Sequence, residues 1–570
     1  MNEDRKRKIT DLVLAYILPL AAVAFFALRY GMYYNTNDDM TFKAISAGLY
    51  DGIPDGHLIF IQYVLGYPLS RLCAAFRGID FYGCMIVLIN YLCITSVLHR
   101  VLTLCRDTKQ RLMTYIAAGS VLIMVFMLDF FIFQWTVTAS ICAATAVFLY
   151  YTDDSGSLPN SIAVTVLFWL SFCIRRMCFL MLCPLFLIIL LTKEKTVENI
   201  RRKKPLMKKH TVCICASLAV LLAVTFGIEI MQYGSGEWVN YKEYNDYRAE
   251  ITDYYGFPPY ETNSDLYDSL GIPAETVPVL DNYGLNIASE ITKEDLAQLA
   301  ERGEELFTQT SEEETHLHKT LRILKTAMTD KGMVPSLILT IAAVLAALAA
   351  FRKEKRLLFS TLTMIAVCVV LSLYLCWQGR YPYRVAKGFM LVLFAMMCAF
   401  LLSEKHELSM PEGFKKPALA VLLAMTAMTG WVTFKEIIAY RNQDWHADMW
   451  NRYVAEHQEN NYVFEINVES SYRFVPVMDY DLQNAYVVGG WLTKSPFRER
   501  QLAHSGASSY KELLVDYDNT YLLTNSPTTY LEDYLRAVGY PCTTEITEVL
   551  FDPNIPYATV NVVKFIRTDE

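Results

Sequence analysis

Two adjacent carboxylates, Asp38 and Asp39, close a short polar segment that follows the first long apolar run of the sequence. A carboxylate within hydrogen-bond reach of a substrate hydroxyl can act as a general base and take its proton as that hydroxyl attacks. The same residue types have a structural use, because Asn37 or Asp38 would suit as the cap of a helix that begins near Met40. Both interpretations, general base and helix cap, stay open on the sequence alone.

A second polar cluster follows at Asp55 and His57, which stand with Asp51 around two glycines. These residues precede an apolar segment, and they can bring a second acidic group back toward the pocket that holds the first pair. A surface turn has the same composition, so an ordinary turn is the alternative.

Positive charge gathers at helix ends that are expected on the same outer face as the acidic pair. The residues concerned are Arg175, Arg176, Arg380, Arg384 and Lys387. A guanidinium group matches phosphate oxygens with two parallel hydrogen bonds, so a lipid phosphate or pyrophosphate is the natural ligand of these arginines. Snorkelling to the membrane surface, or pairing with acidic residues nearby, is the alternative.

Aromatic side chains accompany these charges at Tyr241, Tyr244, Tyr247 and Trp377. Tyrosine and tryptophan are enriched where a membrane meets water, and an interfacial belt is the simpler explanation. Their flat apolar faces can also grip sugar rings or a lipid carrier. We therefore expect contacts with an acceptor or a lipid at these positions.

No metal, cofactor or nucleic acid is expected as a ligand. Most of the 14 cysteines fall inside apolar runs, and no paired Cys/His spacing suggests a zinc site. The Gly489-Gly490-Trp491 segment lacks the spacing of a dinucleotide motif, and no phosphate-binding P-loop is present. We interpret that segment as a turn with an anchoring aromatic.

The composition places these residues in a polytopic α-helical membrane protein. Of 570 residues, 54% are hydrophobic and only 19% are charged, which leaves too little polar surface for a soluble protein of this length. We expect about eleven transmembrane helices of roughly 20 residues, with the Lys- and Arg-rich patches between them in the cytoplasm. The N-terminus is then cytoplasmic, and the C-terminus is extracytoplasmic.

Two apolar segments need separate treatment if the cationic patches are to share one face. Residues 58–76 are expected to form an interfacial helix on the outer surface, and a true span with reversed topology downstream is the alternative. Residues 162–191 are too long for one span and are interrupted by Arg175 and Arg176. Two shorter helices are therefore expected to meet at this pair, near the outer interface.

The transmembrane domain is expected to cover residues 1–434. It includes a first exterior loop at 31–80 and a large acidic exterior loop at 232–332, in which helix-start patterns at 292–295 and 311–314 indicate a folded structure. The first span is expected at 12–30, and the later spans are expected at 212–231, 334–350, 357–375, 389–402 and 418–434.

Residues 435–570 have the composition of a soluble domain, and strand patterns alternate in them with helix patterns. This alternation predicts an extracytoplasmic α/β domain. Its strands are expected at 462–468, 485–488, 520–524 and 558–566, and its helices at 508–515 and 529–538.

The membrane portion resembles the GT-C superfamily of glycosyltransferases, which use polyprenyl-phosphate sugars and include the protein O-mannosyltransferases and the aminoarabinose transferase. The likeness rests on short motifs, which are Asp38-Asp39, Asp55-Gly56-His57, Ile174-Arg175-Arg176 and the segment 379–384. The tyrosine-rich segment 241–260 is similar to the large loop of bacterial membrane proteins of this general kind. The sequence departs from the well-studied members because it has no His-Pro-Pro run after the acidic pair.

The resemblance implies an inverting glycosyltransferase of the bacterial cell envelope, with Asp38 or Asp39 as the general base. The arginines and Lys387 would hold the phosphate of the donor, and the acceptor would be a glycan, a lipid or a protein. The alternatives are a flippase or transporter of lipid-linked glycans, a surface-polysaccharide polymerase, and a non-catalytic envelope protein. A transporter predicts ionisable groups at mid-membrane and often internal repeats, of which the sequence shows little.

Overall fold

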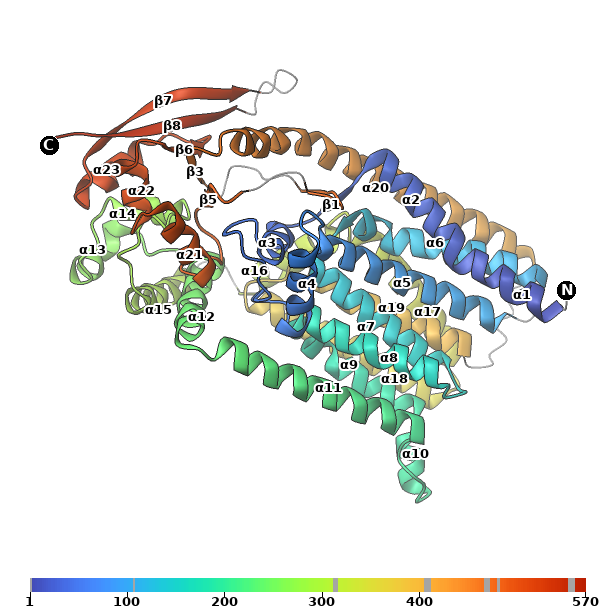
Figure 1. Cartoon of the computed structure of the whole chain (residues 1–570). Coiled ribbons are helices and arrows are strands. Elements are labelled where there is room, and N and C mark those ends of the chain that lie inside the picture. Colours follow the sequence, from blue (N-terminus) through green and yellow to red (C-terminus); the bar gives the residue numbers. More distant parts are fainter. Residues whose placement is uncertain are drawn as a thin grey trace.

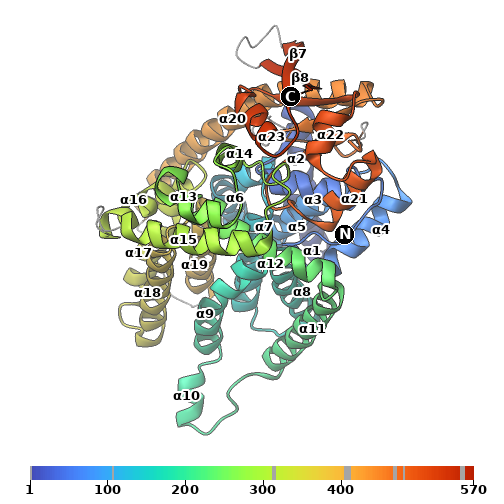
Figure 2. The same cartoon turned by 90° about the vertical axis from the view of Figure 1, so that its left-hand side faces the viewer.

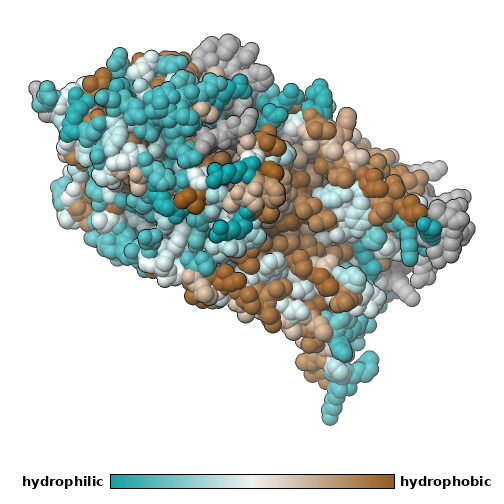
Figure 3. All heavy atoms as spheres, viewed as in Figure 1, coloured by the Kyte–Doolittle hydropathy of each residue, from teal (hydrophilic) through white to brown (hydrophobic). Residues whose placement is uncertain are grey.

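The structure is a computed structural model that describes residues 3–105, 108–310, 316–403, 412–465, 472–478, 482–551 and 559–569. Within these ranges, ten helices are long and apolar enough to cross a membrane. Figure 3 shows hydrophobic surface over the helical bundle and hydrophilic surface over the other end of the molecule. The apolar helices indicate a membrane environment, as the composition predicted.

The apolar helices follow one another along most of the chain (Figure 1). The first span is continuous through α1 (Glu3–Leu12), a π-helical turn η1 (Val13–Ile17) and α2 (Leu18–Tyr30). A shorter apolar helix, α8, covers Leu158–Ile174. The other spans lie in α5 (Phe81–Leu104), α6 (Thr108–Phe131), α7 (Trp135–Thr152), α9 (Arg176–Lys193), α11 (Lys209–Tyr233), α17 (Val334–Phe351), α18 (Lys355–Trp377), α19 (Tyr383–Ser403) and α20 (Glu412–Glu456).

Each later span predicted from the sequence lies inside one of these helices, so an apolar helix is confirmed at each predicted position. Ten candidate spans and one shorter apolar helix, α8, stand where about eleven spans were predicted. The helices α8 and α9 meet at Arg175, whose backbone is not helical (φ −149°, ψ 89°). The predicted break in the segment 162–191 is therefore confirmed.

Helix α7 is the centre of the bundle, because every one of its residues is buried. It packs against α5, α8, α9 and α19. Its many small residues allow neighbouring helices to approach closely, as is common between helices in membranes. A Cβ atom added at Gly388 of α19 would lie 2.6 Å from Ser140 Oγ of α7, so a larger residue there would force the Ser140 side chain to move.

The segment 58–76 forms a helix that is too short to be a candidate span. Helix α4 covers Tyr63–Ala75 and packs against α3 (Asn37–Ala47), α5 and α11. It starts later than predicted because Ile59 has a φ of 62°, in the left-handed region that an α-helix excludes. The backbone N–H of Gln62 donates to the carbonyl of Cys173 at 2.8 Å, which places the start of α4 beside the end of α8.

Helix α20 does not end at the predicted domain boundary after residue 434. It runs on to Glu456 without a glycine or proline after that point, and its 45 residues span about 70 Å. Figure 1 shows it passing from the helical bundle to the C-terminal sheet. Its last turns pack into the C-terminal domain, because Trp450 and Val454 belong to one buried cluster with Tyr462 and Leu523 of the sheet.

The large acidic loop is folded into helices, as predicted. Thr292 and Asp295 cap one of them reciprocally, because the Thr292 N–H donates to Asp295 Oδ2 at 2.8 Å and the Asp295 N–H donates to Thr292 Oγ1 at 3.2 Å. The second predicted helix start, at 311–314, lies outside the described residues. The loop contains α12 (Gly236–Glu250), η2 (Ile251–Tyr255), α13 (Tyr260–Ser269), α14 (Thr276–Asp281), α15 (Lys293–Thr310) and α16 (His316–Thr329).

The C-terminal domain is built on a five-stranded sheet of order β5-β3-β6-β8-β7. Strand β3 pairs in parallel with β5 and β6, while β8 is antiparallel to β6 and β7. The four predicted strands and two predicted helices all overlap observed elements, whereas β7 and α21 were not predicted. The elements are β3 (Asn461–Phe464), β5 (Ala485–Val487), α21 (Pro496–Ser505), α22 (Tyr510–Asp516), β6 (Thr520–Thr524), α23 (Thr529–Ala537), β7 (Cys542–Phe551) and β8 (Thr559–Arg567).

The loop helices and the C-terminal domain share one hydrophobic core. Tyr267 and Leu299 of the loop belong to the same buried cluster as Leu514 and Tyr534 of the domain. Figure 2 shows α12–α15 beside α21–α23 on one face. We call α12–α15 together with the C-terminal domain the polar unit.

A small second sheet connects the polar unit to the bundle. Its central strand β1 (Met32–Tyr34) pairs in parallel with β2 (Ile132–Phe133), between α6 and α7, and antiparallel with β4 (Arg473–Phe474). Helix α3 starts just after β1, so this sheet sets the position of Asp38 and Asp39.

Candidate functional site

The acidic pair lies in the first turn of helix α3. The helix begins at Asn37 and Thr36 is its N-cap residue, so the prediction that Asn37 or Asp38 caps a helix starting near Met40 is wrong. Carboxylates in a first turn interact favourably with the positive end of the helix dipole. The side chains of Asp38 and Asp39 have different surroundings, so the two residues are described separately.

Asp39 is completely buried, and both of its oxygens are occupied. The Tyr82 hydroxyl donates to Oδ1 at 2.6 Å, and the Trp135 backbone N–H reaches the same atom at 3.3 Å. The Thr36 hydroxyl donates to Oδ2 at 2.8 Å. Burial raises the pKa of Asp39 to about 7, although these hydrogen bonds favour the charged form. Asp39 therefore anchors the first turn of α3 to α5 and α7.

The ionisation of Asp39 should lower the free energy of unfolding as the pH rises from about 4 to about 7. Its pKa of about 7 exceeds its ordinary value of 3.8, so the folded state holds this proton more tightly than the unfolded chain. The contribution is therefore complete below about pH 4 and is lost as the pH rises through 7. We expect Asp39→Asn to narrow the difference in melting temperature between pH 5.5 and pH 8, measured by thermal unfolding in detergent. Equal differences in the variant and the wild type would contradict this assignment.

Asp38 is only half-buried, and one of its oxygens is open. The indole Nε1 of Trp491 donates to Asp38 Oδ1 at 2.9 Å. Within the described ranges, Oδ2 has no hydrogen-bond partner. Trp491 comes from the C-terminal domain, and the sequence predicted it only as the anchor of a turn. The carboxylate available to a substrate is therefore that of Asp38.

Aromatic rings form a wall beside the acidic pair. Phe42 lies 5.2 Å from Trp135 and 5.6 Å from Trp491, measured between ring centroids. Phe60 lies 5.9 Å from Trp135 and 5.1 Å from Trp491. The Arg175 guanidinium stands 4.3 Å from the centre of the Trp135 ring, which is a cation–π contact. The contact with Trp135 thus places the Arg175 cation at the site and leaves its charge unneutralised.

Two arginines feel the charge of Asp38, and a third lies near one of them. Burial lowers the pKa of Arg175 and Arg248, and in both the negative charge of Asp38 opposes that effect, so Asp38 lies within electrostatic reach of each. The charge of Arg384 lowers the pKa of Arg175 further. Neither Arg175 nor Arg384 forms an ion pair in the described part of the chain. The structure thus brings Arg175 and Arg248 within electrostatic reach of Asp38, and Arg384 within reach of Arg175, while a role in phosphate binding stays a prediction.

Comparisons with known proteins add nothing to this geometry. No protein-family model, curated protein or solved structure matches the chain. The likeness to the GT-C superfamily therefore stays a prediction, and the chemistry of the site rests on its own residues.

The other predicted cations lie elsewhere or are already paired. Arg380 forms an ion pair of 3.0 Å with Asp253 of the loop. Lys387 is buried in an ion pair with Asp129 and donates to the Gly332 carbonyl at 2.8 Å, so its ammonium group is closed to a phosphate ligand. Arg176 acts electrostatically on Glu229 of α11.

The second acidic cluster is closed by the C-terminal domain. Arg500 of α21 forms ion pairs with Asp51 at 2.8 Å and with Asp55 at 3.2 Å. Asp55 also binds His57 Nδ1 at 2.6 Å, and the His57 ring stacks on Trp238. Burial alone would raise the pKa of Asp55, but its contacts with His57 and Arg500 hold it below the ordinary value. This cluster therefore ties the first loop to the polar unit.

The predicted aromatic contacts divide into buried and exposed residues. Tyr241 and Tyr244 are buried, and the Tyr241 hydroxyl donates to the carbonyl of Trp491. Tyr247 and Trp377 are exposed, at 36% and 61%. Of these four residues, only Tyr241 contacts Trp491, the residue that binds Asp38. Tyr241 therefore helps to hold Trp491 in place.

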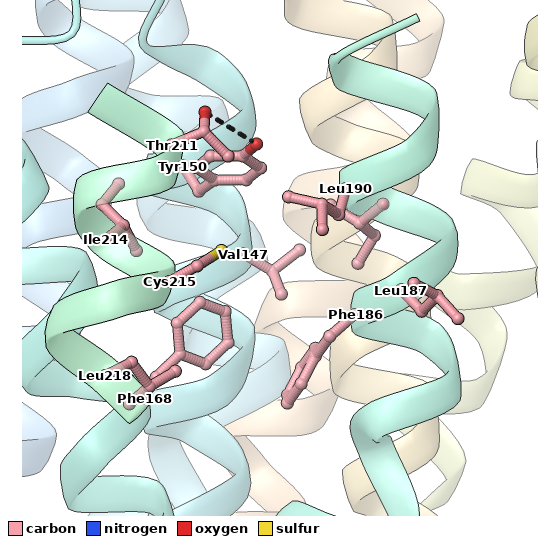
Figure 4. A pocket seen from close by; sticks show the side chains of 11 residues that line it. Val147, Tyr150, Phe168, Phe186, Leu187, Leu190, Thr211, Ile214, Cys215 and Leu218 are labelled. Carbon is pink, nitrogen blue, oxygen red and sulfur yellow. Dashed lines mark hydrogen bonds between the residues drawn. The ribbon is translucent and has the colours of Figure 1, made fainter. Parts of the chain in front are cut away.

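An apolar cavity of about 250 Å³ lies between α7, α8, α9 and α11 (Figure 4). Its polar groups are few, and Thr211 and Tyr150 hydrogen-bond to each other at 3.3 Å. Tyr150 is 15 residues along α7 from Trp135, which is about 22 Å in an α-helix. The cavity is therefore remote from Asp38 and suits a hydrocarbon chain rather than chemistry.

Among the described residues, no group of three or more His, Cys, Asp or Glu side chains is arranged to hold a metal ion. The functional residues that sequence reasoning missed are Trp491, Tyr82, Trp135 and Arg248. Arg248 had a local signal because it belongs to the tyrosine-rich segment after α11, whereas Trp491 was interpreted only as the anchor of a turn.

Proposed function

We propose that this chain is a membrane glycosyltransferase that moves a sugar from a polyprenyl-phosphate donor to an acceptor hydroxyl. The observation that carries the proposal is the half-open carboxylate of Asp38, which Trp491 orients at 2.9 Å and which lies within electrostatic reach of Arg175 and Arg248. A base and cations at one place suit a reaction that deprotonates a nucleophile and releases an anion.

The proposed reaction is a single displacement. The acceptor oxygen attacks the anomeric carbon as its proton passes to Asp38 Oδ2, and the bond from that carbon to the phosphate oxygen breaks. The released phosphate takes the bonding electron pair, and Arg175 and Arg384 stabilise its negative charge. One displacement inverts the anomeric carbon. Asp39 takes no proton in this scheme and acts as a positioning residue for Asp38.

The donor is expected to approach from the membrane side of the aromatic wall. Arg175 stands at the junction of α8 and α9, so a phosphate on a lipid tail can reach it while the tail stays in the bilayer. The assay that tests the proposal is sugar transfer by the reconstituted protein from a panel of labelled polyprenyl-phosphate sugars.

Arg175→Gln should lower transfer by about 10²-fold, the usual effect of removing one preorganised group that stabilises a developing anion. Arg380→Gln is the matched control, because Arg380 already pairs with Asp253 and should change transfer little. Initial rates are measured for both variants with the donor panel. If Arg380→Gln lowered the transfer rate as much as Arg175→Gln does, the assignment of the phosphate site to Arg175 would be wrong.

The reaction is proposed to occur on the extracytoplasmic face. Figure 1 shows α10 (Thr196–Arg201) and the N-terminus at the end of the bundle opposite the polar unit, and cation-rich segments of this kind are retained in the cytoplasm. A cysteine placed at Tyr254 should react with an impermeant maleimide in intact cells, whereas one at Lys203 should react only after lysis. Labelling of position 203 in intact cells would show that the topology is the reverse of the proposed one.

A transporter of lipid-linked glycans is the second candidate, because Asp129 and Lys387 form an ionisable pair buried inside the bundle. Asp129 lies two residues before the end of α6, and Lys387 lies four residues after the start of α19. Such a pair sits near the helix ends rather than at mid-membrane. Movement of a labelled lipid-linked glycan across vesicles, without sugar transfer, would favour the transporter.

A further inference from the structure

A cleft of about 690 Å³ opens between the acidic loop and helix α21 of the C-terminal domain. One wall comes from α12, a second from the segment that leads into α15, and a third from α21 with the turn before it. Its volume is within the range of roughly 300–1,000 Å³ that is typical of ligand pockets. We call it the loop–domain cleft.

The cations that line the cleft are already engaged. Lys293 pairs with Glu243 at 2.6 Å, and Lys494 donates to the Ser289 carbonyl at 2.9 Å. Arg500 bridges Asp51 and Asp55. An anionic ligand would have to break one of these contacts, so the cleft is poorly suited to a phosphate or a sulfate.

The acceptor groups in the lining are free. Glu237 and Glu499 line the cleft, are exposed, and form no ion pair among the residues that the structure describes. Tyr244 also lines it and is 5% exposed, and its hydroxyl has no hydrogen-bond partner in the described ranges. A buried hydroxyl without a partner costs about 1–3 kcal/mol, so a ligand that supplies the missing hydrogen bond is favoured.

The cleft is connected to the proposed catalytic carboxylate through two residues. Tyr241 lines the cleft and donates its hydroxyl hydrogen to the carbonyl of Trp491. The indole of the same Trp491 binds Asp38. A molecule held in the cleft therefore contacts Tyr241, which binds the residue that orients the base.

We infer that the loop–domain cleft binds the acceptor as a glycan chain, neutral or bearing amino groups, and rejects anionic glycans; this inference rests on the proposed function. Sugar hydroxyls and ammonium groups are hydrogen-bond donors, which the carboxylates of Glu237 and Glu499 and the Tyr244 oxygen can accept. The donor phosphate is bound elsewhere, at the arginines near Asp38. The cleft thus separates acceptor recognition from phosphate binding.

The test is a glycan array that holds neutral, amino-sugar and sulfated oligosaccharides, probed with labelled full-length protein in detergent micelles. Wild type should bind neutral or amino-sugar glycans and leave the sulfated ones. The best-bound oligosaccharide is then titrated against each variant. Ala503→Trp, which fills the cleft, should weaken binding more than tenfold, and Tyr244→Phe should weaken it by about five- to tenfold.

Glu499→Gln is expected to weaken binding of amino-sugar glycans, and Glu545→Gln on strand β7 is the matched control that should bind as wild type does. Preference for sulfated glycans, or binding that Ala503→Trp leaves intact, would overturn the inference. Binding measured in Asp38→Asn separates the two proposals. Retained binding with lost transfer supports both, whereas retained binding with normal transfer supports the cleft and removes Asp38 from catalysis.

Discussion

Replacement of Asp38 by asparagine is expected to lower the rate of sugar transfer by about 10³-fold, which is the range of a lost general base. The amide oxygen of asparagine can still accept the hydrogen bond from Trp491, so the geometry of α3 should be kept. The arginines are unchanged, so the KM for the donor should stay close to that of the wild type. Initial rates in proteoliposomes, over a range of donor concentrations, separate kcat from KM.

The neighbouring carboxylate provides the matched control for this variant. Asp39→Asn is the same substitution one residue away, but Asp39 is fully buried and already bound by Tyr82 and Thr36. We expect a loss of about tenfold at most, since the amide can keep part of the hydrogen bonding. Unchanged transfer in both variants would exclude the acidic pair from catalysis. A larger loss in Asp39→Asn would assign the base to that residue instead.

Replacement of Lys387 by methionine is expected to lower the free energy of unfolding by about 3–5 kcal/mol, because it leaves the charge of Asp129 buried without a partner. Both side chains are almost fully buried, at 1% and 4% exposure, so water cannot replace the lost ammonium group. The Gly332 carbonyl also loses its donor. Thermal unfolding of the purified protein in detergent measures the change.

A double variant distinguishes the loss of the pair from the loss of packing. Asp129→Leu combined with Lys387→Met removes both charges, and replacing a buried ion pair by apolar residues is often neutral. We therefore expect the double variant to recover most of the lost stability. Lys331→Met is the exposed control, since the Lys331 side chain is 71% exposed and should not shift the melting temperature. A double variant less stable than Lys387→Met alone would show that the pair is not the cause.

The fold was largely predictable because membrane spans are long and their signal is local. Runs of about 20 apolar residues, with cations between them, marked where the apolar helices lie, although not all of their ends. Two details escaped this approach. The continuation of α20 to Glu456 depends on residues that are polar and merely lack glycine or proline, and the start of α4 depends on the backbone of Ile59.

The candidate site was predicted only where a residue type is unusual for its position. Asp38 and Arg175 were found because charges beside apolar runs are conspicuous. Tyr82, Trp135 and Trp491 were missed since aromatic residues in apolar or strand-end segments are ordinary core residues, and Trp491 is 453 positions away from Asp38. Lys387 was assigned to phosphate because nothing near it in the sequence reveals its partner Asp129, which closes the ammonium group in space.

The shared core of the polar unit has a consequence for how such a protein can evolve. Buried side chains of the loop, such as Leu280 and Leu299, are covered by side chains of a domain encoded more than 150 positions later. A gene shortened after α20 would leave those loop residues exposed to water and would also remove Trp491 from Asp38. We therefore expect the loop and the C-terminal domain to be gained, lost and exchanged among related genes together, as one inherited piece.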